Sequence, residues 1–141
     1  MQGYIDRRTS FNDGSFHAIV FAQSFHHIRN HKKALAECAR LLRDGGRVII
    51  ADSAVLEKRI RSCERTQKYE QTAYMANSSI DGVIWRFTLG AFIKHLEECL
   101  PPALVIRSVE YMRSPHVTNY NLFVPQTDLV AILVKESSSR A

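Results

Sequence analysis

The stretch that decides the fold is FHAIVFAQSFHHIRNHKKALAECARLLRDGGRVIIAD, which runs from Phe16 to Asp52. It opens with an apolar run from Phe16 to Ala22 that only His17 interrupts. A run that is apolar on both faces is typical of a strand inside a parallel sheet. A second apolar run, Arg47 to Ala51, closes the stretch and predicts another buried strand.

The segment between these strands has the pattern of an amphipathic helix from about His31 to Arg43. Asn30 is a suitable N-cap, and Gly45 or Gly46 can take the left-handed conformation that ends a helix. Apolar residues recur at i, i+3, i+4 and i+7, which predicts one face packed on a sheet: Leu35, Cys38, Ala39 and Leu42. Strand, helix and strand with short links predict a right-handed βαβ unit.

The rest of the chain predicts one more helix and two strands. Thr88 is a candidate N-cap for a helix that ends at Pro101. The apolar residues of this helix form one stripe that should be buried: Leu89, Phe92, Ile93, Leu96 and Leu100. Residues 104–112 mix polar and apolar side chains, as an edge strand does, whereas residues 129–134 are apolar throughout. The last strand should therefore insert between strands that are already present. Residues 54–87 are expected to form a lid or insertion.

Composition and charge narrow the class of protein. The chain has 141 residues, enough for one domain, with no apolar run near the length of a membrane span and no apolar signal region. Its three cysteines form no C-x-x-C pair, which favours a reducing compartment, so we expect a cytoplasmic protein. The net charge of +5 is concentrated in residues 57–68, where interleaved acids favour a solvated helix face over a nucleic-acid site.

Polar side chains gather where the two buried strands end. Gln23 and Ser24 follow the first strand, with His26 and His27 just beyond, and Asp52 follows the second. In open α/β sheets, ligands bind at the carboxyl ends of the strands. Imidazole titrates near neutrality, so either histidine could act as a general base or contact a substrate, or could simply pack against the following helix.

The other polar groups leave alternatives open. Gln23 and Ser24 could reach a ligand or merely cap the next helix, and Asp52 could bind a substrate hydroxyl or amine or cap the next segment. A metal site formed by His26, His27 and His31 lacks a cysteine or carboxylate at a familiar spacing, so no metal is expected.

The block FNDGSFHAIVFAQSFHHI, followed by ALAECARLLRDGGRVIIAD, resembles the second half of class I S-adenosylmethionine-dependent methyltransferases. It is most similar to the broad group that acts on small molecules. The resemblance rests on the D-G-S-F turn, the S-F-H-H-I strand end, the D-G-G turn and the V-I-I-A-D strand. It implies an α/β, Rossmann-like sheet whose last strand is antiparallel, S-adenosyl-L-methionine as cofactor, and a small-molecule methyl acceptor.

By this resemblance, Gln23 and Ser24 approach the methionine end of the cofactor, and His27 matches the more usual family histidine. Asp6 is the only candidate for the acid on the adenine side, and His17 stands where the family usually has Asp. The family's glycine-rich loop and ribose-binding acid have no counterpart here, so residues 1–136 are expected to form a truncated domain that lacks the first strands. Residues 137–141 should be a disordered tail.

Two consequences follow from a truncated sheet. The strand from Phe16 to Ala22 should have an open edge that seeks a second copy or a partner chain, because nothing on it blunts such pairing. The chain could also be a catalytically inactive, methyltransferase-like binding or scaffold module, which is the alternative to an enzyme.

Overall fold

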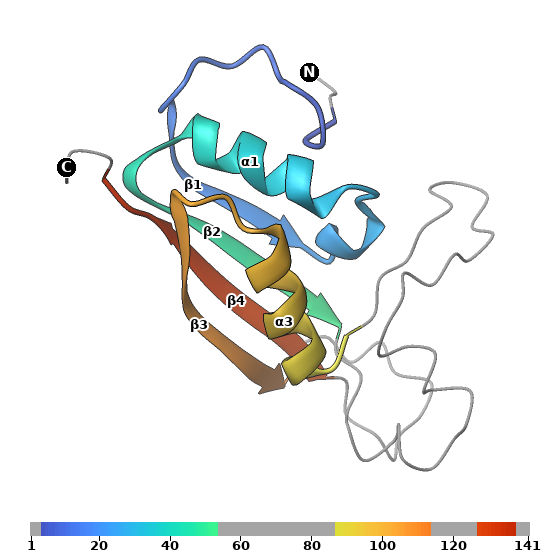
Figure 1. Ribbon diagram of the computed structural model, residues 1–141. Helices are drawn as coiled ribbons and strands as arrows, with labels where there is room; N and C mark the ends of the chain where they lie inside the picture. The colour runs from blue at the N-terminus through green and yellow to red at the C-terminus, as the bar shows by residue number, and fades with distance from the viewer. Residues whose placement is uncertain (1–3, 54–86, 114–126, 138–141) are drawn as a thin grey trace.

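The computed structural model describes residues 4–53, 87–113 and 127–137. They form a four-stranded sheet in the order β1-β2-β4-β3, with β1 Phe16–Ala22, β2 Leu42–Ser53, β3 Leu104–Arg113 and β4 Thr127–Lys135. The two helices, α1 (His31–Leu41) and α3 (Leu89–Cys99), cover the same face of this sheet (Figure 1). A 3₁₀ turn, η1 (Phe25–His27), follows β1.

The strand directions confirm the predicted topology. β1 and β2 are parallel, with Phe21 beside Ile50, and α1 forms the crossover between them. β4 pairs antiparallel with both β2 and β3, so the last strand lies between two strands that precede it in the chain. The sheet is therefore Rossmann-like with an antiparallel final strand, as the apolar character of residues 129–134 indicated.

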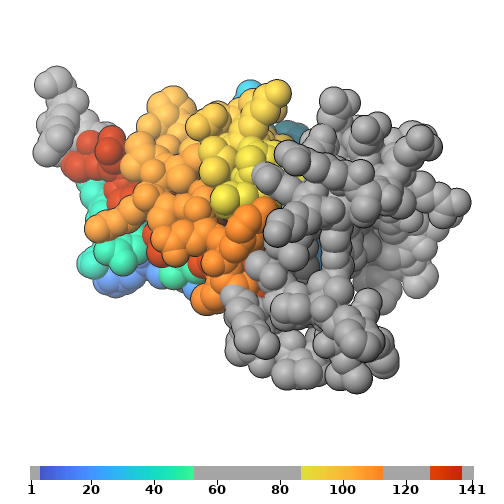
Figure 2. All heavy atoms as spheres, turned by 90° about the horizontal axis from the view of Figure 1, so that it is seen from below, coloured from blue at the N-terminus to red at the C-terminus, as the bar shows by residue number. Residues whose placement is uncertain are grey.

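Both helices begin at the predicted caps. The Asn30 side chain accepts a hydrogen bond from the Lys33 amide at 3.0 Å, and the Thr88 hydroxyl accepts one from the Ala91 amide at 3.3 Å. The predicted stripe of α1 is fully buried, and α3 buries Phe92 and Leu96. Figure 2 looks onto the β3 side of the molecule and shows α3 beside this strand. The core therefore lies between the sheet and the two helices.

The D-G-G turn differs from its expected role. α1 ends at Leu41, and the extended Leu42 already begins β2, so neither glycine caps the helix. The pairing steps from Phe16–Leu42 to Ala18–Arg47, which leaves residues 43–46 as a bulge. Gly45 has a φ of 75°, and a Cβ on Gly46 would lie 2.8 Å from the Arg43 carbonyl oxygen. These glycines shape the entry to the buried strand.

β1 is less buried than its apolar sequence predicts. It pairs only with β2 among the described strands, and Val20 is 61% exposed on the face that α1 and α3 do not cover. Phe21, on the opposite face, is buried beneath the helices. The structure thus makes β1 an edge strand of the described sheet, in agreement with the expected open edge.

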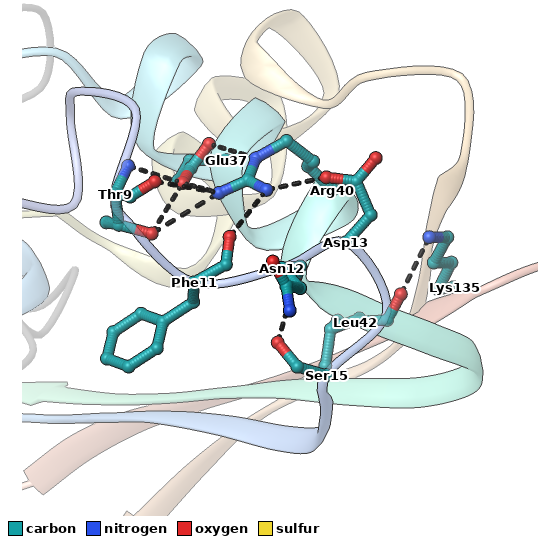
Figure 3. Close-up of polar contacts among 9 residues, drawn as sticks. All are labelled: Thr9, Phe11, Asn12, Asp13, Ser15, Glu37, Arg40, Leu42 and Lys135. Carbon is teal, nitrogen blue, oxygen red and sulfur yellow. Dashed lines mark hydrogen bonds and ion pairs between the residues drawn. The ribbon is translucent and has the colours of Figure 1, made fainter.

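An arginine-centred cluster fixes the N-terminal segment on α1 (Figure 3). The Arg40 guanidinium donates to the Asp13 carboxylate at 2.6 Å, the Phe11 carbonyl at 2.9 Å and both oxygens of Glu37 at 2.5 and 2.9 Å. Thr9 donates to Glu37 from its amide and its hydroxyl, each at 2.8 Å. The bond from Arg40 is the main reason that the pKa of Glu37 is lowered to about 2.

Some expectations fall outside the described residues. They are the base-rich segment 57–68, the expected lid apart from Phe87, and the tail beyond residue 137. Within residues 4–53, 87–113 and 127–137, neither helix has the length and apolarity needed to cross a membrane.

Candidate functional site

The chain reverses direction sharply where β1 ends. Gln23 adopts a left-handed φ of 54°, and its amide still donates to the Ala51 carbonyl at 2.8 Å, which extends the pairing with β2 by one bond. Ser24 then precedes η1 without a side-chain cap hydrogen bond. A left-handed residue other than glycine is uncommon, and such strain often accompanies functional sites.

Phe25 anchors the turn in the core. Its side chain has no exposed surface and packs edge-on against Phe21 and Phe92, with ring centroids 5.4 and 6.4 Å away. On its other side it stacks on the His31 ring at 3.9 Å. Because Phe25 points inward, the next residue of this short turn, His26, is directed towards the end of β2.

His26 and Asp52 meet at this edge of the sheet. His26 Nδ1 lies 2.9 Å from Asp52 Oδ1, and the two side chains are 17% and 8% exposed. The residues come from the carboxyl ends of adjacent parallel strands, where the sequence placed the candidate site. Both were predicted as catalytic residues, but the hydrogen bond between them was not.

The hydrogen bond fixes the protonation of the neutral ring. A carboxylate accepts and cannot donate, so Nδ1 carries the proton and Nε2 carries the lone pair. A histidine oriented by a carboxylate in this way is suited to remove a proton from an acceptor group placed near Nε2. The pair can therefore act as a general base and its orienting partner.

Of the other predicted site residues, His27 contacts the His26–Asp52 pair, Gln23 and Ser24 lie at the end of β1, and Asp6 lies in the N-terminal segment. The His27 ring lies 4.1 Å from the His26 ring, and Gln23 and Ser24 are exposed at the end of β1. Asp6 is half-buried in the N-terminal segment, and no hydrogen bond or ion pair joins it to the other candidates among the described residues.

Sequence reasoning missed a contact between the two helices. His31 Nδ1 lies 2.7 Å from His95 Nε2, and His31 Nε2 lies 2.8 Å from the Phe25 carbonyl oxygen. Both nitrogens of His31 are thus engaged by protein groups. The sequence did contain a sign of this contact, because His95 lies on the same helix face as Phe92, Leu96 and Cys99, at the spacing of a buried stripe.

Comparison with known proteins identifies the fold. Residues 1–50 match the family model described as a methyltransferase domain. The structure is similar to that of an S-adenosylmethionine-dependent methyltransferase from Methanosarcina mazei, with a TM-score of 0.64 at 15% identity over 95% of this chain. The chain has the class I methyltransferase fold. It covers 65% of the length of that neighbour, so it corresponds to part of the neighbour's chain.

Two further structures share this methyltransferase fold. One is the 1,6-didemethyltoxoflavin-N1-methyltransferase of Burkholderia thailandensis, solved with 1,6-didemethyltoxoflavin and S-adenosylhomocysteine. It has a TM-score of 0.62 and 13% identity, and the match covers 94% of this chain and 48% of that one. The other is a putative methyltransferase of Haloferax volcanii in complex with the Trm112 methyltransferase activator. It has a TM-score of 0.62 and 16% identity, and the match covers 99% of this chain and 61% of that one.

Proposed function

We propose that this chain supplies the acceptor-side part of an S-adenosylmethionine-dependent methyltransferase that acts on a small molecule. The observation that carries the proposal is the His26–Asp52 hydrogen bond at the carboxyl ends of β1 and β2. The methyltransferase fold adds the class of reaction, and S-adenosylmethionine is the cofactor of that family.

The residues at the strand ends fit such a role by their chemistry. The cofactor, when bound, supplies an electrophilic methyl group on a sulfonium, which leaves readily. Gln23 and Ser24 lie exposed beside the ends of β1 and β2, where they can bind the polar methionine end of this cofactor.

His26 and Asp52 would act on the methyl acceptor. Nε2 of His26 takes the proton that the acceptor hydroxyl or amine loses as it is methylated, and Asp52 stabilises the imidazolium that forms. His27, whose ring contacts that of His26, would contact the acceptor. Alignment of the acceptor with the methyl group, away from water, contributes the larger part of catalysis in such a reaction.

Substitution of the pair tests this role. His26→Ala and Asp52→Ala should each lower the rate of methyl transfer by roughly 10²–10⁴-fold, the usual contribution of general acid–base catalysis. Activity should fall by more than the loss of stability explains, because neither side chain belongs to the apolar core. The assay is transfer of labelled methyl from S-adenosylmethionine, with protein purified from its native source together with any chain bound to it.

His17→Ala is the matched control, since His17 is an exposed histidine on the same strand that does not reach the pair. It should retain the parent rate. If His26→Ala and Asp52→Ala lose melting temperature in proportion to activity, both residues are structural and the chain is better described as a scaffold module.

The open edge of β1 makes a partner part of the proposal. The outer N–H and C=O groups of β1 face no described strand, and Val20 adds exposed apolar surface beside them. Native edge strands are usually blunted by charge, proline or a bulge. We therefore propose that two copies of the 141-residue chain pair through β1. The further proposals of a single domain over residues 1–136 and of a cytoplasmic location rest on the sequence.

Val20→Lys should weaken this self-association by about tenfold or more in dissociation constant, because it places a charge at the edge. Since Val20 is 61% exposed, the accompanying loss of stability should be small. Light scattering across a dilution series measures the association. Met112→Lys, at an exposed position on the opposite edge strand, should leave it unchanged. A parent chain that stays monomeric at every concentration would rule out the β1 interface.

A further inference from the structure

Two histidines from different helices meet beneath the candidate site. His31, the first residue of α1, is 3% exposed, and His95 lies half-buried in the middle of α3. Their rings are hydrogen-bonded at 2.7 Å and held between aromatic side chains. Phe25 stacks on His31 with a centroid distance of 3.9 Å, and Phe87 stacks on His95 at 4.8 Å.

The hydrogen bonds allow one arrangement of protons in the neutral rings. The Phe25 carbonyl can only accept, so His31 Nε2 carries a proton and donates it at 2.8 Å. His31 Nδ1 then holds a lone pair and accepts from His95 Nε2–H. Donation therefore runs in one direction, from His95 to His31 to the Phe25 carbonyl. Burial lowers the pKa of both histidines, which keeps them neutral near pH 7.

This chain of bonds ends on the turn that carries His26. The Phe25 carbonyl also accepts from the Ile28 amide at 3.1 Å, so both of its lone pairs are used. η1 has only three residues, and Ser24 gives it no side-chain cap. Contacts from outside the turn therefore help to set its orientation, and the bond from His31 is directed at its backbone.

We propose that His31 and His95 are positioning residues: a two-imidazole relay that holds η1 so that His26 Nδ1 remains on Asp52. The effect of this relay on catalysis rests on the proposed function, in which His26 is the general base. It acts without touching the acceptor or the cofactor. The side chains come from α1 and α3, so the packing of these helices is coupled to the geometry of the site at the end of β1.

A metal centre would use the same residue types, but the geometry does not favour one. Both ring nitrogens of His31 are occupied by hydrogen bonds, and no group of three or more candidate ligands capable of holding a metal occurs in the described parts of the chain. Cys99 Sγ, at 3.7 Å from His95 Nε2, is a weak neighbour of the relay.

Long-range ¹H–¹⁵N spectra of the histidines in the 141-residue chain test the relay directly at pH 7. His31 and His95 should both appear as neutral rings protonated at Nε2, and His26 as a ring protonated at Nδ1. Protonation of His95 at Nδ1 instead of Nε2 would overturn the relay, and this result needs no variant.

Variants then separate positioning from general stability. His95→Phe keeps an aromatic ring on Phe87 but removes the donor, so the His26 ring should lose its single tautomer and its Nδ1 proton should exchange about tenfold faster, the equivalent of one hydrogen bond. His31→Gln keeps a donor for the Phe25 carbonyl and should preserve the His26 signals, whereas His31→Leu should not. His17→Phe is the control and should have no effect.

Unchanged His26 signals in both His95→Phe and His31→Leu would overturn the proposal, even if their melting temperatures fall. Because these spectra need neither cofactor nor acceptor, they can fail or succeed independently of the methyl-transfer assay. Normal His26 signals in the 141-residue chain, with no methyl transfer by the protein purified together with any chain bound to it, would count against the proposed function and leave the relay intact.

Discussion

Phe25→Ala should lower the free energy of unfolding by about 3–5 kcal/mol, the usual loss when a buried aromatic ring is removed from a core. Phe25 has no exposed surface and contacts Phe21, Phe92 and His31, so the cavity would open between the sheet and both helices. The same change should release η1 and separate His26 from Asp52. Urea unfolding followed by circular dichroism measures the loss of stability.

Phe11→Ala is the matched control for this prediction. Phe11 is 44% exposed and packs edge-on against Phe16 at 5.1 Å, so its removal should cost about 1 kcal/mol or less. Similar losses for Phe25→Ala and Phe11→Ala would contradict the assignment of Phe25 as the anchor of the turn.

Acidification should destabilise the chain in two overlapping steps. The pKa of His31 falls from 6.5 to about 3 in the folded chain, mainly because burial disfavours the charged ring. The His31 ring therefore binds a proton in the unfolded state but not in the folded state, and stability is lost as the pH drops below 6.5. This loss is on the order of 2 kcal/mol at pH 5, at 1.36 kcal/mol for each pH unit.

The charged groups around the histidine pair set the size of this step. His95 and His26 disfavour a charge on His31, whereas Glu98 raises the pKa of His95 against the effect of its burial. Below pH 4.5 a second loss begins, because Arg40 lowers the pKa of the folded Glu37 carboxylate to about 2, and the unfolded carboxylate, with its ordinary pKa of 4.5, then takes up a proton more readily.

Melting temperatures measured from pH 8 to pH 3 check both steps. His31→Gln has no titrating ring, so the loss of stability between pH 6.5 and pH 4.5 should become smaller, while the contribution of Glu37 below pH 4.5 should persist. A melting temperature that stays constant from pH 7 to pH 5 would show that His31 is not held neutral by burial.

Local patterns were sufficient to predict the βαβ unit. Asn30 and Thr88 cap the helices that their sequences indicated, and the apolar residues 129–134 form the inserted strand. The D-G-G turn was assigned wrongly because Gly45 in a left-handed conformation suits both a helix end and a strand bulge. The two are distinguished by the pairing with β1, which steps from Phe16–Leu42 to Ala18–Arg47, and that pairing is tertiary.

The site was predictable in position but not in its contacts. His26 and Asp52 follow parallel strands, so a shared edge could be inferred from the order of elements. The hydrogen bond between them depends on the left-handed Gln23 and on the buried Phe25, which together aim the His26 ring. The His31–His95 bond joins residues 64 positions apart, and helical periodicity alone does not reveal which side chains from two helices will meet.

In the proposed function, the ends of β1 and β2 form the acceptor side of a methyltransferase site, while the 141 residues contain neither the glycine-rich loop nor the ribose acid that bind most of the cofactor. A ¹H–¹⁵N titration of the 141-residue chain with S-adenosylhomocysteine tests this claim most directly. We expect shifts that are confined to the strand ends and saturate only at millimolar ligand, at Gln23, Ser24, His26, His27 and Asp52. A micromolar dissociation constant, or shifts that spare the ends of both strands, would contradict it.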